Sequence, residues 1–166
     1  MTTATDTRES LSAALKTSTA EAHDKAEHSV FMDDLLAGKL SVADFIALQE
    51  QSWLFYSALE DAARAVADHP LASGIVDPAL ERVNALEHDL NHLHGSTEWR
   101  TTVTPLPATA EYIARLKDIE ETKDVARLLA HHYVRYLGDL SGGQVIGRMM
   151  QRHYGVSDEC VTFYHF

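Results

Sequence analysis

Apolar residues recur along the chain at intervals of three and four, the spacing of one helix face, and strand-like alternation is absent from the sequence. A first helix is predicted over about Thr7–His28. Its apolar positions fall roughly on one face: Leu11, Leu15, Ala22 and Ala26. A second helix is predicted to begin near Ser41, where SVAD is an N-cap followed by an acid at the third position. This helix should end at His69–Pro70, because proline stops a helix.

The second half of the chain continues the helical pattern. Asp77 and Pro78 predict the N-cap and first residue of a third helix, which should end near His94–Gly95. After a connection that contains Pro105 and Pro107, a shorter helix is expected over about Ala108–Ile119. Asp124 should cap a last, long helix, and Gly155 fits its C-terminal stop. The pattern therefore predicts an all-α fold in a single domain over residues 1–166.

Composition narrows the class of protein. The 166 residues suffice for one domain with a real core, and 45% hydrophobic with 23% charged residues is typical of a soluble globular chain. No apolar run is long enough to cross a bilayer, and MTTATDTRES lacks the features of a secretory signal. A single cysteine, Cys160, cannot form an internal disulfide. These features favour the cytoplasm, and the net charge of −11 disfavours nucleic acid and anionic lipid as partners.

Four of the eight glycines lie in GDLSGGQVIG, residues 138–147, inside the last predicted helix. An unbroken helix from Asp124 to Tyr154 would be roughly 46 Å long. That length overruns a domain whose radius of gyration is about 15 Å, so a bend is expected. Four glycines in a helix sacrifice roughly 4 kcal/mol relative to alanine. Either close helix packing at a kink or a large flat ligand lying against the bare backbone could offset this cost.

Spacing places several residues of this segment on one helix face, in a rhythm of four and three. They are His131, Arg135, Gly138, Gly142, Val145 and Met149. Asp139, Gly143 and Ile146 share the adjoining face. A patch of bare backbone therefore lies beside one carboxylate.

A flat ligand with a metal centre would need an axial ligand from elsewhere in the chain. His23 and Glu27 are four residues apart and share a helix face, and Lys16 lies on that face too. Glu27 could fix the tautomer of a ligating His23, as carboxylates do beside metal-bound histidines. The alternative is an ordinary solvated salt bridge. His88 and His92 also have a spacing that occurs in zinc sites, but no fourth ligand follows the expected pattern, and we interpret them as a solvated helix end.

Three segments resemble one known family, the heme oxygenases. AHHYVRYLGDLSGGQVIGRMMQRHYG, residues 130–155, is similar to the family's distal-helix motif, and TSTAEAHDKAEHSVFM, residues 17–32, to its proximal-helix motif. QEQSWLFYSALE, residues 49–60, resembles the segment that carries the family's buried tyrosine. The likeness extends to Phe166 and is strongest to the bacterial type that acquires iron.

The resemblance implies a role for each matching residue. The cofactor contacts would come from Lys16, His23, Glu27, Met32, Tyr133, Gly138, Ser141, Gly142 and Gly143. The catalytic group would be Asp139, Arg135, Tyr56, Gly138 and Gly142, with Asp139 holding a distal water network. His23 would be the axial ligand of the heme iron and Glu27 its hydrogen-bonding partner. Lys16 and Tyr133 would meet the heme propionates.

The same resemblance implies the reaction. Heme b would be both cofactor and substrate, and O2 with electrons from an external donor would open it to biliverdin, CO and Fe²⁺. A reductase or ferredoxin-type partner and a monomeric state are expected. Phe31 and Met32 would pack near the ring, although plain packing is the alternative for both. A heme carrier or sensor without turnover is the rival function, and a helical interaction module without cofactor is a third.

Family members continue beyond the motif that ends in FYHF into helices that cover part of the pocket. We expect from this difference, and from the apolar end of the sequence, that the natural protein extends past Phe166.

Overall fold

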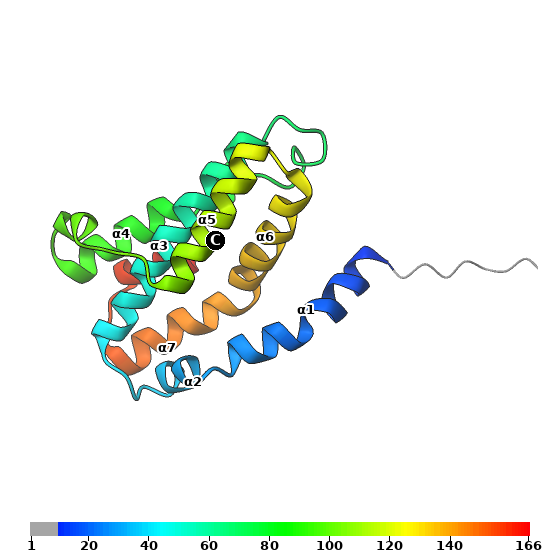
Figure 1. The fold of residues 1–166 in the computed structure, drawn as a ribbon. Coiled ribbons are helices and arrows are strands. Elements are labelled where there is room, and N and C mark those ends of the chain that lie inside the picture. Colours follow the sequence, from blue (N-terminus) through cyan, green and yellow to red (C-terminus); the bar gives the residue numbers. More distant parts are fainter. Residues whose placement is uncertain (1–9) are drawn as a thin grey trace, which may run out of the picture.

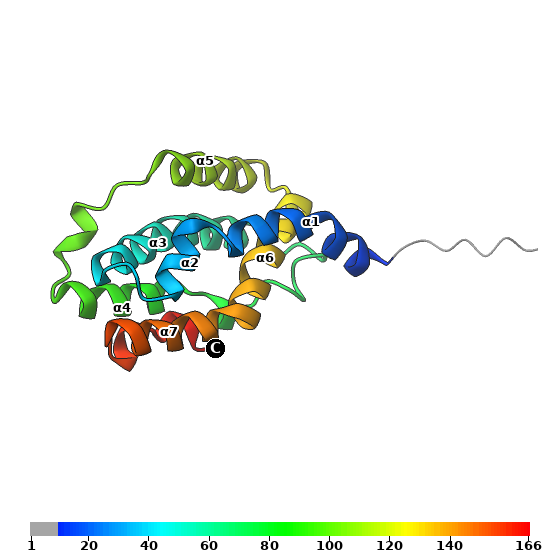
Figure 2. The same cartoon turned by 90° about the horizontal axis from the view of Figure 1, so that it is seen from below.

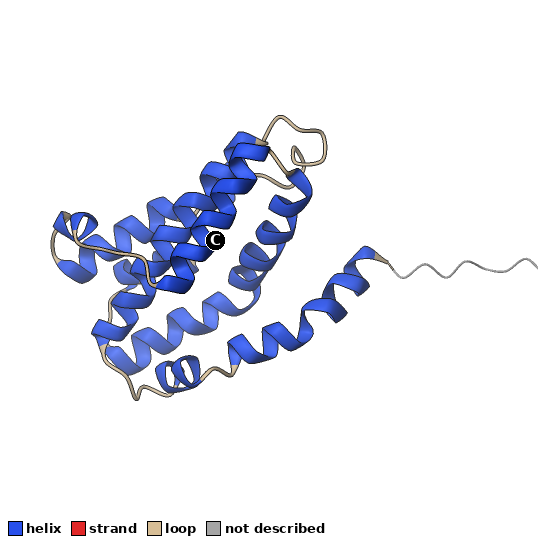
Figure 3. Ribbon diagram, in the orientation of Figure 1, coloured by secondary structure: helices blue, strands red, loops and turns tan. Residues whose placement is uncertain are grey.

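The computed structural model describes residues 10–166, and within that range every regular element is a helix (Figures 1 and 3). The α-helices are α1 (Leu11–Glu27), α2 (Val30–Leu36), α3 (Val42–Ala65), α4 (Val83–His94), α5 (Pro107–Thr122), α6 (Val125–Gly138) and α7 (Gln144–Tyr154). The shorter turns are η1 (Pro78–Leu80), η2 (Glu98–Thr101), η3 (Asp139–Gly143), η4 (Asp158–Cys160) and η5 (Thr162–Tyr164). The predicted all-α class is confirmed.

Local sequence signals predicted several helix ends correctly. Ser41 and Asp44 form a capping box at the start of α3, in which each side chain bonds the backbone N–H of the other. The Asp124 carboxylate accepts from the N–H of Arg127 and caps α6. Gly95 and Gly155 take the left-handed conformation that ends α4 and α7.

Other boundaries differ from the prediction. The first helix ends at Glu27, and Ser29 caps a separate short helix, α2, that the pattern did not indicate. The part of the predicted first helix before Ser10 lies outside the described residues. The second helix, α3, ends at Ala65, before the proline that was expected to stop it, and α5 extends to Thr122.

The predicted third helix is divided in two. Asp77 caps only the short 3-10 turn η1, and α4 begins at Val83, six residues after Asp77. The cause is Glu60 of α3, whose Oε1 accepts from the N–H groups of Arg82 and Val83 at 2.6 and 2.9 Å. A buried carboxylate from another helix therefore caps α4 in place of a local side chain.

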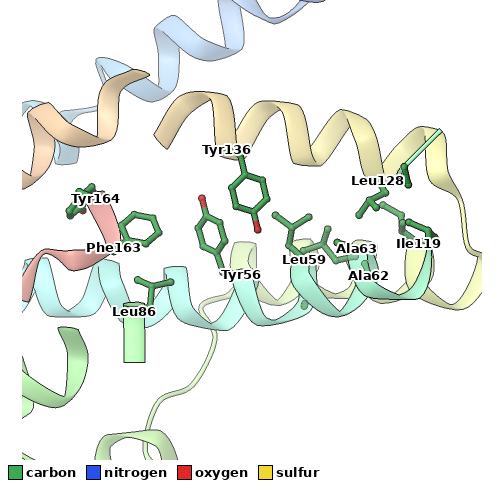
Figure 4. Packing of buried hydrophobic residues seen from close by; sticks show 14 of the residues in the cluster. Tyr56, Leu59, Ala62, Ala63, Leu86, Ile119, Leu128, Tyr136, Phe163 and Tyr164 are labelled. Carbon is green, nitrogen blue, oxygen red and sulfur yellow. The ribbon is translucent and has the colours of Figure 1, made fainter. Parts of the chain in front are cut away.

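Helix α3 forms the centre of the molecule and packs against α4, α5 and α6. Figure 2 shows α3 between α5 on one side and α4 and α7 on the other. The core contains Leu59, Ala62 and Ala63 from α3, with Ile119 of α5 and Leu128 of α6 (Figure 4). The last described segment is buried in the same core, through Val161, Phe163 and Tyr164. It forms two 3-10 turns, η4 and η5.

Replacing Glu60 tests whether this carboxylate holds α4 in place. Glu60→Ala leaves the N–H groups of Arg82 and Val83 without their acceptor, and we expect a loss of roughly 2–4 kcal/mol in the free energy of unfolding. Glu60→Gln keeps one oxygen for both bonds and should cost less than about 1 kcal/mol. Urea unfolding of the two variants measures the difference. Equal losses would instead assign the effect to the negative charge, which lies 3.7 Å from Arg64.

Candidate active site

The glycine-rich segment forms a π-helical turn. α6 ends at Gly138, residues Asp139–Gly143 form η3, and α7 begins at Gln144, with helical backbone angles at both junctions. A π-turn widens a helix by one residue and redirects it without breaking the chain of backbone hydrogen bonds. Figure 1 shows the resulting change of direction between α6 and α7. The bend predicted from helix length and glycine content is therefore present.

The four glycines of this segment separate into two pairs with different surroundings. Gly138 and Gly142 are exposed, and a Cβ added at either would meet no atom within 4 Å. Gly143 and Gly147 are buried, and an added Cβ would lie 3.3 and 3.2 Å from the Tyr164 side chain. Close packing thus explains Gly143 and Gly147, whereas Gly138 and Gly142 leave the backbone bare. The missing side chain of Gly143 makes room for Tyr164, and its expected contact with a cofactor stays a prediction.

The stretch of chain that contains Gly138 and Gly142 also carries exposed apolar side chains. Val134, Leu137, Leu140 and Val145 are each between 43 and 54% exposed, although all four are aliphatic. Several exposed aliphatic side chains in one short stretch of a domain are consistent with a surface that binds something apolar. A flat apolar ligand fits such a surface, because the two glycines allow it to approach the backbone.

Asp139 lies at the start of the π-turn, beside the bare backbone, and accepts a hydrogen bond from the hydroxyl of Tyr56. Tyr56 comes from α3 and is only 2% exposed. Burial raises the pKa of the Asp139 carboxyl from 3.8 to about 6, against the opposing effects of the Tyr56 hydrogen bond, Arg135 and Arg82. Burial, together with the Asp139 charge, also raises the pKa of Tyr56 well above 10.0. The pair is therefore a proton donor bonded to a carboxylate that titrates close to neutral pH.

Arg135 lies one helical turn before Asp139 and is held by two aromatic rings. Its guanidinium carbon is 4.2 Å from the ring centroid of Phe55 and 5.1 Å from that of Tyr112. Sequence reasoning included Arg135 but not these two rings, since Tyr112 comes from α5 and only the tertiary packing brings it there.

His23 and Glu27 meet on α1 as their spacing predicted. The Nδ1 atom of His23 is 3.3 Å from Oε2 of Glu27, which leaves Nε2 as the ring nitrogen available to a metal. Both side chains are exposed, by 71 and 59%, and Lys16 is exposed on the same helix. α1 has no buried residue, and Figure 1 shows it standing apart from α6 and α7. The structure thus brings His23 to Glu27 on an exposed helix.

The other residues expected at a cofactor have less distinctive positions. Met32 on α2 and Tyr133 on α6 are half-buried, and Phe31 is 41% exposed. The Ser141 hydroxyl donates to the carbonyl of Leu137 at 2.7 Å, so its own helix already uses this donor.

The second histidine group is a surface pair on α4. The rings of His88 and His92 have centroids 4.3 Å apart, and Nδ1 of His92 is 2.8 Å from the carbonyl oxygen of His88. In residues 10–166, no three His, Cys, Asp or Glu side chains gather closely enough to hold a bare metal ion. Nor does that part of the chain contain a helix with the length and apolar character of a membrane span.

Comparison with known proteins gives consistent matches. The family model described as heme oxygenase matches residues 9–166. Heme oxygenase 1 of Gallus gallus is 38% identical over 143 residues, and heme oxygenase 1 of Synechocystis sp. is 35% identical over 156 residues. These alignments cover 86 and 94% of this chain, but the chain spans only 48 and 64% of those relatives.

A solved structure extends the likeness to three dimensions. The crystal structure of heme oxygenase-1 from the cyanobacterium Synechocystis sp. in complex with heme superposes with a TM-score of 0.83 at 34% identity. That match covers 92% of this chain and 68% of the other. The family model spans all of the described residues, and the likeness in fold agrees with it. The chain belongs to the heme oxygenase family.

Proposed function

We propose that this protein is a heme oxygenase, which opens heme b with O2 and external electrons to biliverdin, CO and Fe²⁺. The observation that carries the proposal is the position of a buried acid, Asp139, next to a helix face left bare by Gly138 and Gly142. A related protein of the same fold is known in complex with heme. Bound heme supplies the redox-active iron and the ring that is cleaved.

The residues present suit the binding of heme between α1 and the bend. Nε2 of His23 is the candidate axial ligand, and Glu27 orients the ring from the Nδ1 side. The bare backbone of Gly138 and Gly142 allows the opposite face of a flat macrocycle to approach closely. Lys16 and Tyr133 are the candidate contacts of the propionates. Met32 and Ser141 complete the expected set, Ser141 through its position one residue before Gly142 rather than through a free hydroxyl.

In the proposed reaction the protein side chains transfer protons. At pH 7 a carboxyl with a pKa of about 6 is roughly nine-tenths ionised, so Asp139 can both take up and release a proton. Tyr56 holds the carboxylate in place, and Arg135 favours its ionised form. The close backbone of Gly138 and Gly142 leaves little room on that side, and this restricts the direction in which oxygen can meet the ring.

Three further features belong to the proposal. The electrons come from a separate reductase or ferredoxin-type partner. The reaction serves to release iron from heme in the cytoplasm, as the likeness to the bacterial iron-acquisition type suggests. The protein acts as a monomer, in one domain over residues 1–166.

A hemin titration followed by reductant under O2 tests the proposal against the rival of a heme carrier or sensor. An enzyme should bind one hemin, lose the Soret absorbance after reduction and accumulate biliverdin. Stoichiometric binding with a stable Soret band would show a carrier, and the absence of binding would exclude both functions.

Replacing His23 tests the axial ligand. His23→Ala should abolish the histidine-ligated heme spectrum and most biliverdin formation, because no other group on α1 takes its place beside Glu27. Added imidazole should partly restore both. His28→Ala is the matched control, since His28 is exposed near the end of the same helix and should leave the spectrum unchanged. If the histidine-ligated spectrum were lost only in His28→Ala, the axial ligand would be His28 and not His23.

Replacing Asp139 with alanine should separate binding from turnover. The variant keeps His23 and the bare backbone, so hemin affinity should change little. Without the proton-handling carboxyl, biliverdin formation should fall by roughly 100-fold or more. Optical hemin titration and product analysis measure the two quantities. Wild-type biliverdin yield from the variant would show that another group handles the proton.

The raised pKa of Asp139 also predicts a cost in stability. A carboxyl that titrates at about 6 when folded and at 3.8 when unfolded binds protons more tightly in the folded chain. Its contribution is therefore most favourable below pH 4 and is lost as the pH rises to 6. Asp139→Asn should be about 1–3 kcal/mol more stable than wild type at pH 7.5, and the gain should shrink towards pH 4. Urea unfolding at both pH values measures this, and a gain that does not vary with pH would contradict it.

A further inference from the structure

We infer that Asp89 of α4 is a positioning residue for the Tyr56–Asp139 pair, and that it acts through the η5 turn, Thr162–Tyr164. This inference deepens the proposed function, because it assigns a residue far from the bare glycine face to the control of the acid beside it. It rests on that function only for its effect on turnover.

The first step is the way in which Asp89 holds the turn. Asp89 is fully buried, and its Oδ1 accepts from the N–H of Thr162 at 3.0 Å and from the Thr162 hydroxyl. Its Oδ2 accepts from the N–H of Phe163 at 2.9 Å. A buried carboxylate is costly unless its oxygens are satisfied, and here three donors from one short turn converge on it. Arg82 holds the same segment further on, through a bond to the carbonyl of His165 at 2.8 Å.

The second step is what this turn does to Tyr56. The ring of Phe163 lies edge-on to that of Tyr56, with centroids 5.5 Å apart. Figure 4 shows Phe163 between Tyr164 and Tyr56 in a row of rings that continues to Tyr136. Tyr56 is thus packed between Phe163 and Tyr136, and this packing directs its hydroxyl at Asp139.

The third step is the contact of the turn with the π-helix. The Tyr164 ring fills the space left by Gly143 and Gly147, at distances where any Cβ would have to displace it. Gly143 is the last residue of the π-turn that begins with Asp139. Tyr164 therefore supports the backbone that carries the carboxylate, while Phe163 supports the tyrosine that bonds it. The bonds from Asp89 to the η5 turn, here called the clamp, therefore hold both partners of the Tyr56–Asp139 hydrogen bond in place.

Three groups influence the pKa of the Asp139 carboxyl: Tyr56 on α3, Arg82 before α4 and Arg135 on α6. The Asp139 charge in turn helps to raise the pKa of Tyr56, of Tyr136 on α6 and of Tyr164 on η5. Of these, Tyr164 belongs directly to the clamped turn, and Tyr56 is packed against it. Release of the turn should admit water to the carboxyl and loosen its bond from Tyr56.

The test is an NMR titration of the protein without heme, labelled with ¹³C at the aspartate carboxyls. Asp139→Asn assigns the Asp139 resonance, whose midpoint should be about 6 in the wild type. In Asp89→Asn the amide nitrogen cannot accept the bond that Oδ2 now receives, so the turn should be released. The Asp139 midpoint should then fall by about one unit or more, because burial is the largest cause of the raised pKa and its relief outweighs the loosened Tyr56 bond, whose loss acts in the opposite direction. Asp68→Asn is the matched control, since Asp68 is exposed and should leave the midpoint unchanged.

Two further variants keep the test decisive if Asp89→Asn fails to fold. Gly147→Ala pushes on Tyr164 without touching Asp89, and Tyr164→Leu removes the ring. Both should shift the Asp139 midpoint, whereas the conservative Tyr164→Phe keeps the ring and should preserve it. An unchanged midpoint in the folded variants would overturn the inference and leave Asp89 with a purely structural role.

Turnover provides the second readout. In the shifted variants biliverdin yield per heme should fall by about tenfold or more, because a small displacement of a catalytic group has a large effect on rate. Hemin affinity should change much less, since His23, Gly138 and Gly142 are untouched. Weakened affinity with a normal yield would overturn the inference. Failure of the chain to turn over heme at all would refute the proposed function instead, and the heme-free titration would still decide the role of Asp89.

Discussion

The hydrogen bond between Tyr56 and Asp139 joins the central helix of the fold to the bend in the glycine-rich helix. It determines much of the local structure, because a carboxylate in an apolar interior must be satisfied by a donor that packing holds in place. Tyr56 can serve as that donor only while rings on both sides hold it, and these belong to Phe163 and Tyr136. The aromatic row in the core is therefore both packing for α3 and support for one acid.

The glycines of the bent helix allow close packing on the core side and a bare backbone on the outer side. Gly138 and Gly142 are four residues apart, as are Gly143 and Gly147, and the two pairs are offset by five residues. Their surroundings place the two pairs on different sides of the bent helix, since Gly138 and Gly142 are exposed and Gly143 and Gly147 are buried. One pair accepts the Tyr164 ring from the core, and the other leaves the outer face bare. Packing explains one pair and an exposed backbone explains the other, so neither explanation accounts for all four glycines.

What could be predicted from the sequence was mostly what neighbouring residues decide. The caps at Ser41 and Asp124, the stops at Gly95 and Gly155 and the pair His23–Glu27 all depend on groups within four or five residues of one another. The bend also followed from length and composition.

Contacts between distant segments could not be read in this way. Tyr56 and Asp139 are separated by 83 residues and Asp89 and Phe163 by 74, so no spacing rule links them. Tyr56 was found only through the family resemblance, and Asp89 was not found at all. The division of the third helix has the same origin, because its cap comes from Glu60, 22 residues earlier than Arg82.

α1 shows how a ligand can complete a fold of this kind. It carries His23, yet none of its residues is buried, and Leu11 is 77% exposed. A helix gains most of its stability from packing an apolar face, and α1 has no buried residue to contribute such packing. In the proposed complex, heme would lie between this helix and the bare face at Gly138 and Gly142 and supply the missing apolar contact. Heme binding and the docking of α1 would then be one coupled event, since a ligand that binds only the docked arrangement stabilises it by mass action.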